Sequence, residues 1–267
     1  MAFPQYMWIL LVVSAALCAV GFYKFVYFLS IGYGLAVAGE GVVIAILALT
    51  NGNWTVALLV QCVLFVVYGF RLSGFLLIRE IKSASYRKTL NEQTEKPVPI
   101  FVKAVIWIVV AALYVAQVSP VFYRAQLSGA LRIGSLSTWI GAAIMLLGIL
   151  LEATADRQKS AAKKNDPDMV ATQGLYKLCR CPNYFGEIVF WTGVLISAVT
   201  VLRGWQWLIA VLGYVCIVYI MFNGAQRLER RQNKRYGEKQ EYLDYVRRTP
   251  ILIPLLPIYH LTGGKKK

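Results

Sequence analysis

The sequence predicts an all-α membrane protein, built as a bundle of seven transmembrane helices. Of its 267 residues, 58% are hydrophobic and 15% are charged, and a soluble domain of this size has too small an interior to bury so much apolar surface. The charged residues stand in blocks, and the apolar runs between them approach the roughly 20 residues that a helix needs to cross a bilayer. The Lys and Arg residues gather in alternate loops, which indicates an odd number of spans.

The predicted spans follow the apolar runs in chain order. The first run is similar in length to a signal peptide, but it has no basic leader and no clear cleavage site, so it is interpreted as a span. The second is expected to tilt or break around its glycines, which are Gly32, Gly34, Gly39 and Gly41. The seven predicted spans are Met7–Val20, Phe25–Thr50, Trp54–Leu77, Phe101–Val118, Leu136–Leu151, Phe185–Val201 and Trp205–Phe222.

The basic residues predict which side of the membrane each loop faces. With seven spans, one side carries most of the Lys and Arg residues, and the other side carries only Arg124, Arg132 and Arg203. Because positively charged loops stay in the cytoplasm, the N-terminus is predicted outside and the C-terminus in the cytoplasm. Loops that face anionic membrane lipids explain most of the net charge of +15, and a bound anionic cofactor is the other explanation. Nucleic acid is not an expected partner, because no recognisable binding module is present.

No linker rich in Gly, Ser or Pro divides the chain, so residues 1–267 are predicted to form a single membrane-embedded domain. The segments Ser83–Pro99 and Asp156–Cys181 are interpreted as cytoplasmic loops that cover the mouth of the bundle. Beyond Tyr236, tyrosines alternate with basic residues, a pattern that predicts an amphipathic tail helix at the membrane surface. The protein is expected to act as a monomer.

The cysteine and histidine content excludes several kinds of site. Cys18, Cys62 and Cys216 lie inside apolar runs and are interpreted as small core residues. The one histidine, His260, lies near the end of the tail, so neither a metal site nor a Ser-His-Asp arrangement is expected. The chain also lacks the glycine-rich nucleotide-binding motifs of Rossmann and P-loop proteins.

The most informative segment is Cys179–Glu187, which reads C-R-C-P-N-Y-F-G-E. It joins a basic segment to a long apolar run, so polar side chains stand at a membrane boundary. Such groups need partners so close to hydrocarbon, either one another or a bound polar ligand. Asn183 is also a suitable helix cap, and Glu187 is favourably placed near a helix N-terminus. The polar residues of this candidate site are Arg180, Asn183, Tyr184 and Glu187.

A set of motifs in fixed order resembles the DUF1295 and steroid 5α-reductase family of integral-membrane reductases, in a bacterial form. The resemblance covers roughly Trp139–Pro257 well and Val63–Arg79 more weakly. Related membrane methyltransferases share only the shorter R-x-P-x-Y-x-G core and the tail pattern. The motifs are Leu151–Lys159 (L-E-A-T-A-D-R-Q-K), Gly174-Leu175-Tyr176, the R-C-P-N-Y-F-G-E run, Arg248-Thr249-Pro250 and Leu252-Ile253-Pro254.

This resemblance implies NADPH bound in a cavity open to the cytoplasm, in residues 139–257 for the most part, and location in the bacterial inner membrane. It implies hydride transfer to the C=C bond of a lipid α,β-unsaturated ketone, such as a 3-oxo-4-ene steroid. Two positions depart from the pattern: Cys181 replaces a usual His, and Glu152 replaces an Asn of the steroid reductases. The expected cofactor-binding residues are Arg71, Asp156, Lys163, Arg180, Asn183, Tyr184 and Glu187, with Arg227 and Tyr236 in the tail segment.

The resemblance also implies a catalytic pair, Glu40 and Tyr68. Tyr68 and Arg71 match a Tyr-x-x-Arg in the third helix, and Glu40 matches an acid of the second helix that pairs with the Tyr. The chemistry supports these residue types, because hydride delivery to an enone leaves negative charge on the ketone oxygen. A tyrosine hydroxyl in a dry site stabilises that charge, and a neutral neighbouring carboxyl strengthens the hydroxyl as a donor.

Other readings stay open from the sequence. Tyr68 is one of 16 tyrosines, and its role could be packing between helices. The long side chain of Arg71 could extend to the membrane interface and place its charge there. The alternative enzyme is an S-adenosylmethionine-dependent methyltransferase acting on a lipid or a lipidated thiol. A third hypothesis is a non-enzymatic membrane component whose basic loops bind lipid headgroups or a partner. For the reductase, the expected partners are a lipophilic small-molecule substrate and membrane lipids.

Overall fold

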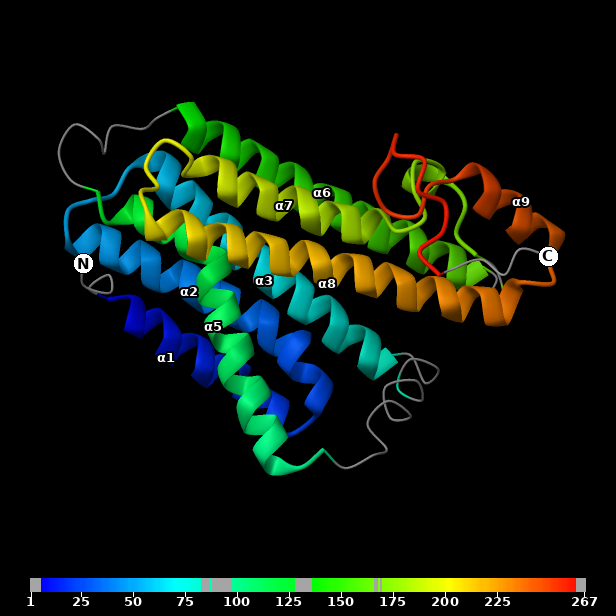
Figure 1. The fold of residues 1–267 in the computed structure, drawn as a ribbon, viewed down its shortest axis with the longest axis horizontal. Coiled ribbons are helices and arrows are strands. Elements are labelled where there is room, and N and C mark those ends of the chain that lie inside the picture. Colours follow the sequence, from blue (N-terminus) through cyan, green and yellow to red (C-terminus); the bar gives the residue numbers. More distant parts are fainter. Residues whose placement is uncertain are drawn as a thin grey trace. The chain divides into compact units, whose positions relative to one another are not determined.

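The structure, a computed structural model, describes residues 6–82, 87, 98–127, 136–165, 168 and 170–262 (Figure 1). Every regular element in these residues is a helix. The chain separates into two compact units, one of Met1–Ala142 with Val194–Tyr214 and one of Ala143–Gly193 with Val215–Lys267. The helices α6 (Leu136–Asn165), α7 (Pro182–Ser197) and α8 (Trp205–Tyr236) each have residues in both units. The prediction of a single domain stays a prediction.

Helices lie at all seven predicted spans, and five of them are long and apolar enough to cross a membrane. The first predicted span is a short helix of 12 residues extended by one 3-10 turn, and the sixth, α7, has 16 residues. The five long helices fit an integral membrane protein, whereas a count of seven spans and the orientation of the termini stay predictions. The five candidate spans are Ile31–Thr50, Val56–Lys82, Ile100–Ala125, Leu136–Lys164 and Trp205–Tyr236.

The first unit is organised around the antiparallel helices α2 and α3. Its remaining helices pack on α2 and on one another through aromatic and small apolar side chains. Trp107 of α5 donates from Nε1 to the carbonyl of Ala15 in α1 at 2.7 Å, which joins these two helices. The elements of this unit are α1 (Met7–Cys18), 3-10 turns at Ala19–Phe22 and Phe25–Leu29, α2 (Ile31–Thr50), α3 (Val56–Lys82) and α5 (Ile100–Ala125).

The glycines of α2 are packing positions and do not break the helix. The helix runs without interruption from Ile31 to Thr50, and the irregular backbone lies before it, at Ser30. A Cβ atom on Gly34 would lie 2.6 Å from the carbonyl oxygen of Gly69, and one on Gly69 would lie 2.1 Å from that of Gly34. Because helices inside a membrane gain little from the hydrophobic effect, such close backbone approach is the means by which they associate. The break expected as one possibility at these glycines is therefore absent, and a tilt of this span stays a prediction.

The second unit brings α6 and α7 together in the same way. A Cβ atom on Gly148 of α6 would lie 2.5 Å from the backbone nitrogen of Phe190 and 2.7 Å from the carbonyl oxygen of Gly186 in α7. This contact fixes the first turns of α7, which carry the polar residues of the predicted site. The unit also contains the greater part of α8, a 3-10 turn at Gly174–Lys177 and the short helix α9 (Gln240–Arg248).

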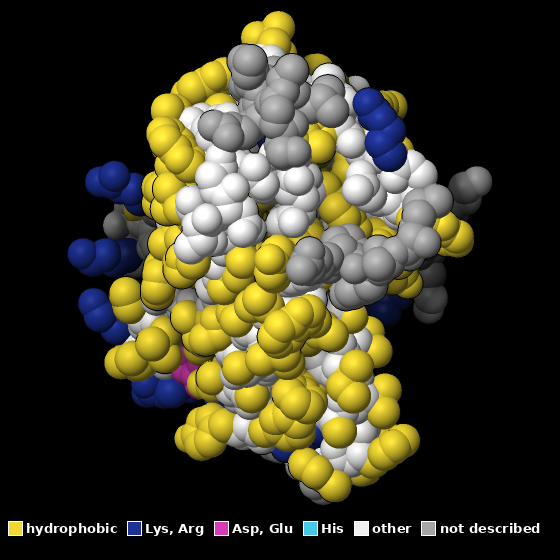
Figure 2. All heavy atoms as spheres, turned by 90° about the vertical axis from the view of Figure 1, so that its left-hand side faces the viewer, with side chains coloured by type: hydrophobic (Ala, Val, Ile, Leu, Met, Phe, Trp, Pro, Cys, Tyr) yellow, Lys and Arg dark blue, Asp and Glu magenta, His cyan; other side chains and the backbone are white. Residues whose placement is uncertain are grey.

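The surface agrees with membrane insertion. Figure 2 shows one face of the molecule, on which hydrophobic side chains cover much of the described surface and Lys and Arg side chains stand mainly toward the edge. Large apolar side chains on the long helices are widely exposed, among them Phe70 (60%), Ile108 (61%) and Leu212 (56%). Lipid is the environment in which such side chains are stable outside a protein core.

Gly69→Ala is expected to destabilise the first unit by about 1–3 kcal/mol, because the new methyl group would overlap the backbone of α2, which has no room to yield. Gly74→Ala in the same helix is the matched control, since nothing lies within 4 Å of its Cβ position. That variant is expected to be neutral or slightly stabilising, as Ala is the better helix former. Thermal unfolding in detergent measures both, and equal midpoints would contradict the proposed close contact.

Candidate functional site

The candidate site of the second unit is built on the segment that leads into α7. Pro182 is the first residue of α7, a position where its missing N–H and fixed φ angle suit a helix. The backbone N–H of Arg180 donates to the carbonyl of Pro250 at 2.9 Å, so the segment is tied to the C-terminal tail. The hydroxyl of Tyr245 in α9 donates to the carbonyl of Tyr176 at 2.7 Å and adds a second link.

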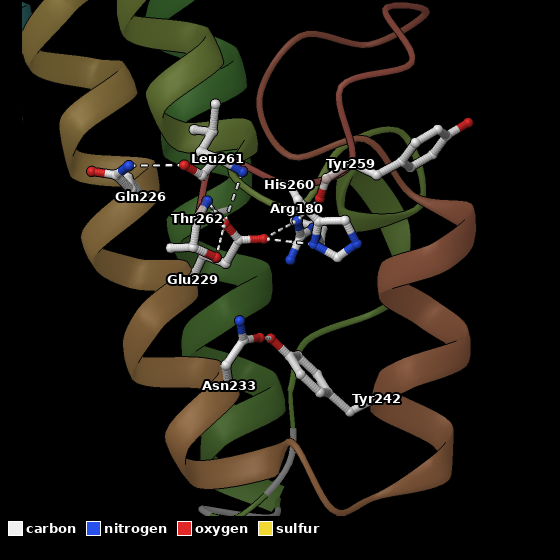
Figure 3. A network of polar contacts seen from close by, with 9 residues as sticks. All are labelled: Arg180, Gln226, Glu229, Asn233, Tyr242, Tyr259, His260, Leu261 and Thr262. Carbon is white, nitrogen blue, oxygen red and sulfur yellow. Dashed lines mark hydrogen bonds and ion pairs between the residues drawn. The ribbon is translucent and has the colours of Figure 1, made fainter. Parts of the chain in front are cut away.

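An ion pair between Arg180 and Glu229 lies at the centre of this site (Figure 3). The guanidinium Nη2 of Arg180 donates to the Oε1 atom of Glu229 in α8 at 2.9 Å, and it also donates to the carbonyl of Tyr259. Both side chains are excluded from solvent, with exposed fractions of 1% and 0%. A buried pair of this kind is strongly coupled, because each charge left alone would lose its hydration without compensation.

Glu229 holds the C-terminal segment as well as Arg180. Its Oε2 atom accepts the backbone N–H groups of Leu261 and Thr262, each at 2.9 Å, and the Thr262 hydroxyl at 3.0 Å. Its Oε1 atom also lies 3.1 Å from Nδ1 of His260, whose side chain is half exposed. These hydrogen bonds stabilise the charged form of the Glu229 carboxylate. We call this group of Arg180, Glu229 and residues 259–262 the tail latch.

Two further donors of Arg180, Nε and Nη1, form no hydrogen bond of ordinary geometry in the part of the chain that the structure describes, although the guanidinium interacts with the Tyr242 hydroxyl. Both atoms are buried. The Tyr242 hydroxyl itself donates to Oδ1 of Asn233 at 2.6 Å. Because a buried guanidinium is costly with unmet N–H groups, this face of Arg180 is suited to an oxygen acceptor of a bound ligand.

A second polar group joins two residues that the sequence predicted as cofactor contacts. The Nζ atom of Lys163, in the last turn of α6, donates to the hydroxyl of Tyr236 at 2.8 Å. It also lies 5.2 Å from the centre of the Tyr236 ring, within the range of a cation–π interaction. These two residues are 73 positions apart in sequence, and the packing of α6 and α8 brings them together.

The remaining predicted residues of this unit differ in their surroundings. Asp156 is 9% exposed, and Asn183 is half-buried in the first turn of α7. The Tyr184 ring packs on Gly224 of α8, in the apolar cluster that contains Cys181. Glu187 is 5% exposed and accepts a hydrogen bond from Nε1 of Trp191 at 3.3 Å. Arg227 is exposed on α8, and its cofactor role stays a prediction.

The predicted catalytic pair lies in the first unit, and the expected hydrogen bond between its members is not formed. The Tyr68 hydroxyl donates to the Tyr33 hydroxyl at 3.0 Å, and neither carboxyl oxygen of Glu40 has a hydrogen bond to any described residue. The register of α2 and α3 explains this, because Gly41 packs at the level of Phe65, about one helical turn from Tyr68. Glu40 faces Ser14 of α1 instead. Arg71 is half-buried on α3.

Burial changes the acidity of several groups next to Arg180. It raises the pKa of the Cys179 thiol to about 11 and that of the Cys181 thiol to about 12. It also raises the pKa of Tyr242 to about 12. At neutral pH both thiols are therefore protonated, and Cys181 lies in an apolar cluster with Ile188, where it is a packing residue. A nucleophilic thiolate is not what these surroundings produce.

The sequence reasoning missed the residue at the centre of the tail latch. Glu229 is the one acid between Phe222 and Tyr236, a stretch that contains five Lys or Arg residues. A lone acid in a basic helix is a signal that could have identified Glu229 from this one sequence. His260 was interpreted as peripheral, yet its backbone neighbours bind Glu229.

The comparisons with known proteins place the chain in a family. Residues 34–249 match the family described as "Protein of unknown function (DUF1295)", and the chain belongs to this family. Membership suggests a membrane enzyme of the steroid reductase and methyltransferase-like group. No curated protein matches the chain.

Glu229→Gln is expected to lower the free energy of unfolding by about 3–5 kcal/mol, because it leaves the buried Arg180 charge without its counter-ion. Glu238→Gln is the control, since it removes an exposed carboxylate just beyond the same helix. Thermal unfolding in detergent gives the comparison. The double variant Arg180→Met/Glu229→Met should recover much of the loss, because it removes both buried charges; no recovery would argue against the ion pair as the cause.

Cys179 and Cys181 are expected to resist alkylation in the folded protein at pH 8. With a pKa of about 12, about one Cys181 thiol in ten thousand is a thiolate at that pH, and the thiolate is the reactive form. The raised pKa means that labelling should stay slow until the pH approaches 11. Peptide mass spectrometry after maleimide treatment, with and without prior denaturation in SDS, measures the difference. Rapid labelling of folded protein at pH 8 would show that the segment is open.

Proposed function

We propose that this protein is an NADPH-dependent reductase that transfers hydride to the C=C bond of an α,β-unsaturated ketone in a lipid, for example a 3-oxo-4-ene steroid. The observation that carries the proposal is the buried Arg180 in a chain of the DUF1295 family, whose Nε and Nη1 donors form no hydrogen bond of ordinary geometry to a described residue. A phosphorylated cofactor supplies oxygen acceptors of the required charge.

The side-chain types of the second unit match the chemical groups of such a cofactor. Arg180 and Lys163 are cations for phosphate oxygens, and Asn183 offers both donors and an acceptor for a carboxamide or a ribose. Glu229 fits this scheme as a positioning residue, because it holds one side of the guanidinium and leaves the other side to the ligand. Asp156, Tyr184, Glu187, Arg227 and Tyr236 complete the proposed binding set of the second unit, and Arg71 of the first unit stays a predicted cofactor contact.

The bound nicotinamide would supply the hydride. The protein would hold the reactants in position, exclude water from the site and supply a proton donor. We assign Tyr68 as the donor to the substrate ketone, with its hydroxyl held in the resting protein by Tyr33. Tyr68 has an exposed fraction of 0%, so it acts in a site from which water is excluded. Glu40 remains part of the proposed pair. Because it makes no hydrogen bond to Tyr68 in the resting protein, its contact with Tyr68 would form only when substrate is bound.

Asn183→Ala is expected to weaken NADPH binding about tenfold, because it removes hydrogen bonds to the cofactor. Tyr68→Phe is expected to leave NADPH affinity unchanged and to lower kcat about a hundredfold or more, since the donor acts on charge that develops in the transition state. Tyr123→Phe, at another buried tyrosine of the first unit, is the control and should change neither. Binding titrations and product mass with 4-ene-3-ketosteroids and polyprenyl enones give the readouts.

Cofactor binding by the same purified protein distinguishes the reductase hypothesis from the methyltransferase hypothesis. Purified protein in detergent is heated with NADPH or with S-adenosylmethionine, and the reductase predicts stabilisation by NADPH. Stabilisation by S-adenosylmethionine alone would replace the proposal with methyl transfer to a lipid or a lipidated thiol. Stabilisation by neither compound would favour the third hypothesis, a non-enzymatic membrane component whose basic loops bind lipid headgroups or a partner.

A further inference from the structure

The C-terminal segment of the second unit contains a closed loop of apolar residues. All residues from 251 to 258 are leucine, isoleucine or proline, and we call residues 251–258 the apolar loop. The backbone N–H of Ile251 donates to the carbonyl of Ile258 at 2.8 Å, which joins the two ends of the loop. The chain before it is bound to Arg180 through the carbonyl of Pro250, and the chain after it belongs to the tail latch. The loop therefore has a fixed position beside the candidate site.

The base of the apolar loop packs on the apolar parts of α7 and α8. Ile251 and Leu252 are each 1% exposed, and they form one buried cluster with Ile188 of α7 and Ala225 of α8. Phe222, at the end of the apolar run of α8, packs against the same cluster. Because α8 is one of the helices long and apolar enough to cross a membrane, the base of the loop lies near the edge of the hydrocarbon layer.

The tip of the apolar loop presents large apolar side chains to its surroundings. Leu255 is 99% exposed, and Leu256 and Ile258 are 45% and 37% exposed. The φ angle of Leu255 is 71°, in the left-handed region that glycine adopts readily and that a leucine side chain disfavours. A leucine held there in water is unfavourable both for its backbone and for its apolar side chain. The combination indicates that the tip contacts an apolar environment.

The charged part of α8 next to the apolar loop suits an anionic surface. Arg227, Arg230 and Arg231 are exposed, and they lie within about two helical turns of Ala225. The acid between them, Glu229, is fully buried in the tail latch and does not reach the surface. Apolar side chains next to exposed cations are typical of protein segments at the interface of a membrane that contains anionic lipids.

We propose that the apolar loop inserts into the membrane interface beside the first turns of α7, with Leu255, Leu256 and Ile258 among the lipid acyl chains. The exposed arginines of α8 then lie at the level of the lipid headgroups. Pro254 and Pro257 suit this position, because proline has no N–H group that needs a partner in hydrocarbon. The inserted tip attaches the C-terminal segment to the bilayer, and the tail latch connects that segment to Arg180.

The depth of the loop in a bilayer tests this proposal. Full-length protein is placed in vesicles of phosphatidylglycerol and phosphatidylcholine, with a nitroxide spin label on Leu255→Cys. Cys216→Ala removes the native cysteine that is not fully buried. Power saturation with oxygen and with a water-soluble nickel complex should place the label about 5–10 Å inside the boundary between headgroups and acyl chains. The control label on Glu238→Cys, an exposed position just beyond α8, should lie in water.

Two variants show whether the side chains of the tip hold the loop in the lipid. In the protein labelled at position 255, Leu256→Asp should move the label toward water, because a carboxylate is excluded from hydrocarbon. Gln240→Asp, an equal change of charge at an exposed position of α9, should leave the depth unchanged. An unchanged depth in Leu256→Asp would overturn the assignment of the tip as the contact with lipid.

Two further outcomes of the labelling would contradict membrane insertion. Equal exposure of the labels at positions 255 and 238 to the nickel complex would show that the loop lies in water. Magnetic broadening between labels at position 255 on two molecules would show that a second copy of the chain covers the tip. Either result would overturn the proposal, and neither bears on the reductase activity, which cofactor binding tests separately.

Discussion

The second unit depends on the buried ion pair between Arg180 and Glu229. Three segments that are far apart in the sequence meet at one carboxylate: the segment before α7, the charged end of α8 and residues 259–262 (Figure 3). A charge removed from water must be matched by a partner, so the position of each segment constrains the others. The same requirement holds the C-terminal segment against the protein, although that segment has little regular structure.

The two polar groups of this unit differ in how firmly their charges are paired. Glu229 is fully enclosed and accepts donors from several residues, which suits a fixed structural centre. Of the cations around Tyr236, Lys239 lines a cavity, and Asp168, the acid paired with Arg235, is largely exposed. Arg180 combines both properties, because one side of its guanidinium is paired and the other has unmet donors.

Small residues position the polar groups in both units. In the first, Gly34 and Gly69 let the backbones of α2 and α3 approach, and this contact sets the register that places Tyr68 opposite Tyr33. In the second, Gly148 and Gly186 do the same for α6 and α7. Within a membrane, close backbone contact replaces much of the hydrophobic force that packs soluble helices. A side chain added at these points would move the groups that the proposed chemistry requires.

The amino-acid sequence by itself determined the class of the protein, the order of its helices and its family, because apolar runs and local motifs are read along one segment at a time. It also selected Lys163 and Tyr236 for the same site, and the structure joins them by a hydrogen bond. Only the tertiary structure decided the partners of the buried charges. Glu229 was overlooked and the Glu40–Tyr68 hydrogen bond was wrongly expected, since both depend on how one helix is shifted along another. That shift is set by the summed contacts of whole helix faces, which no local pattern of residues specifies.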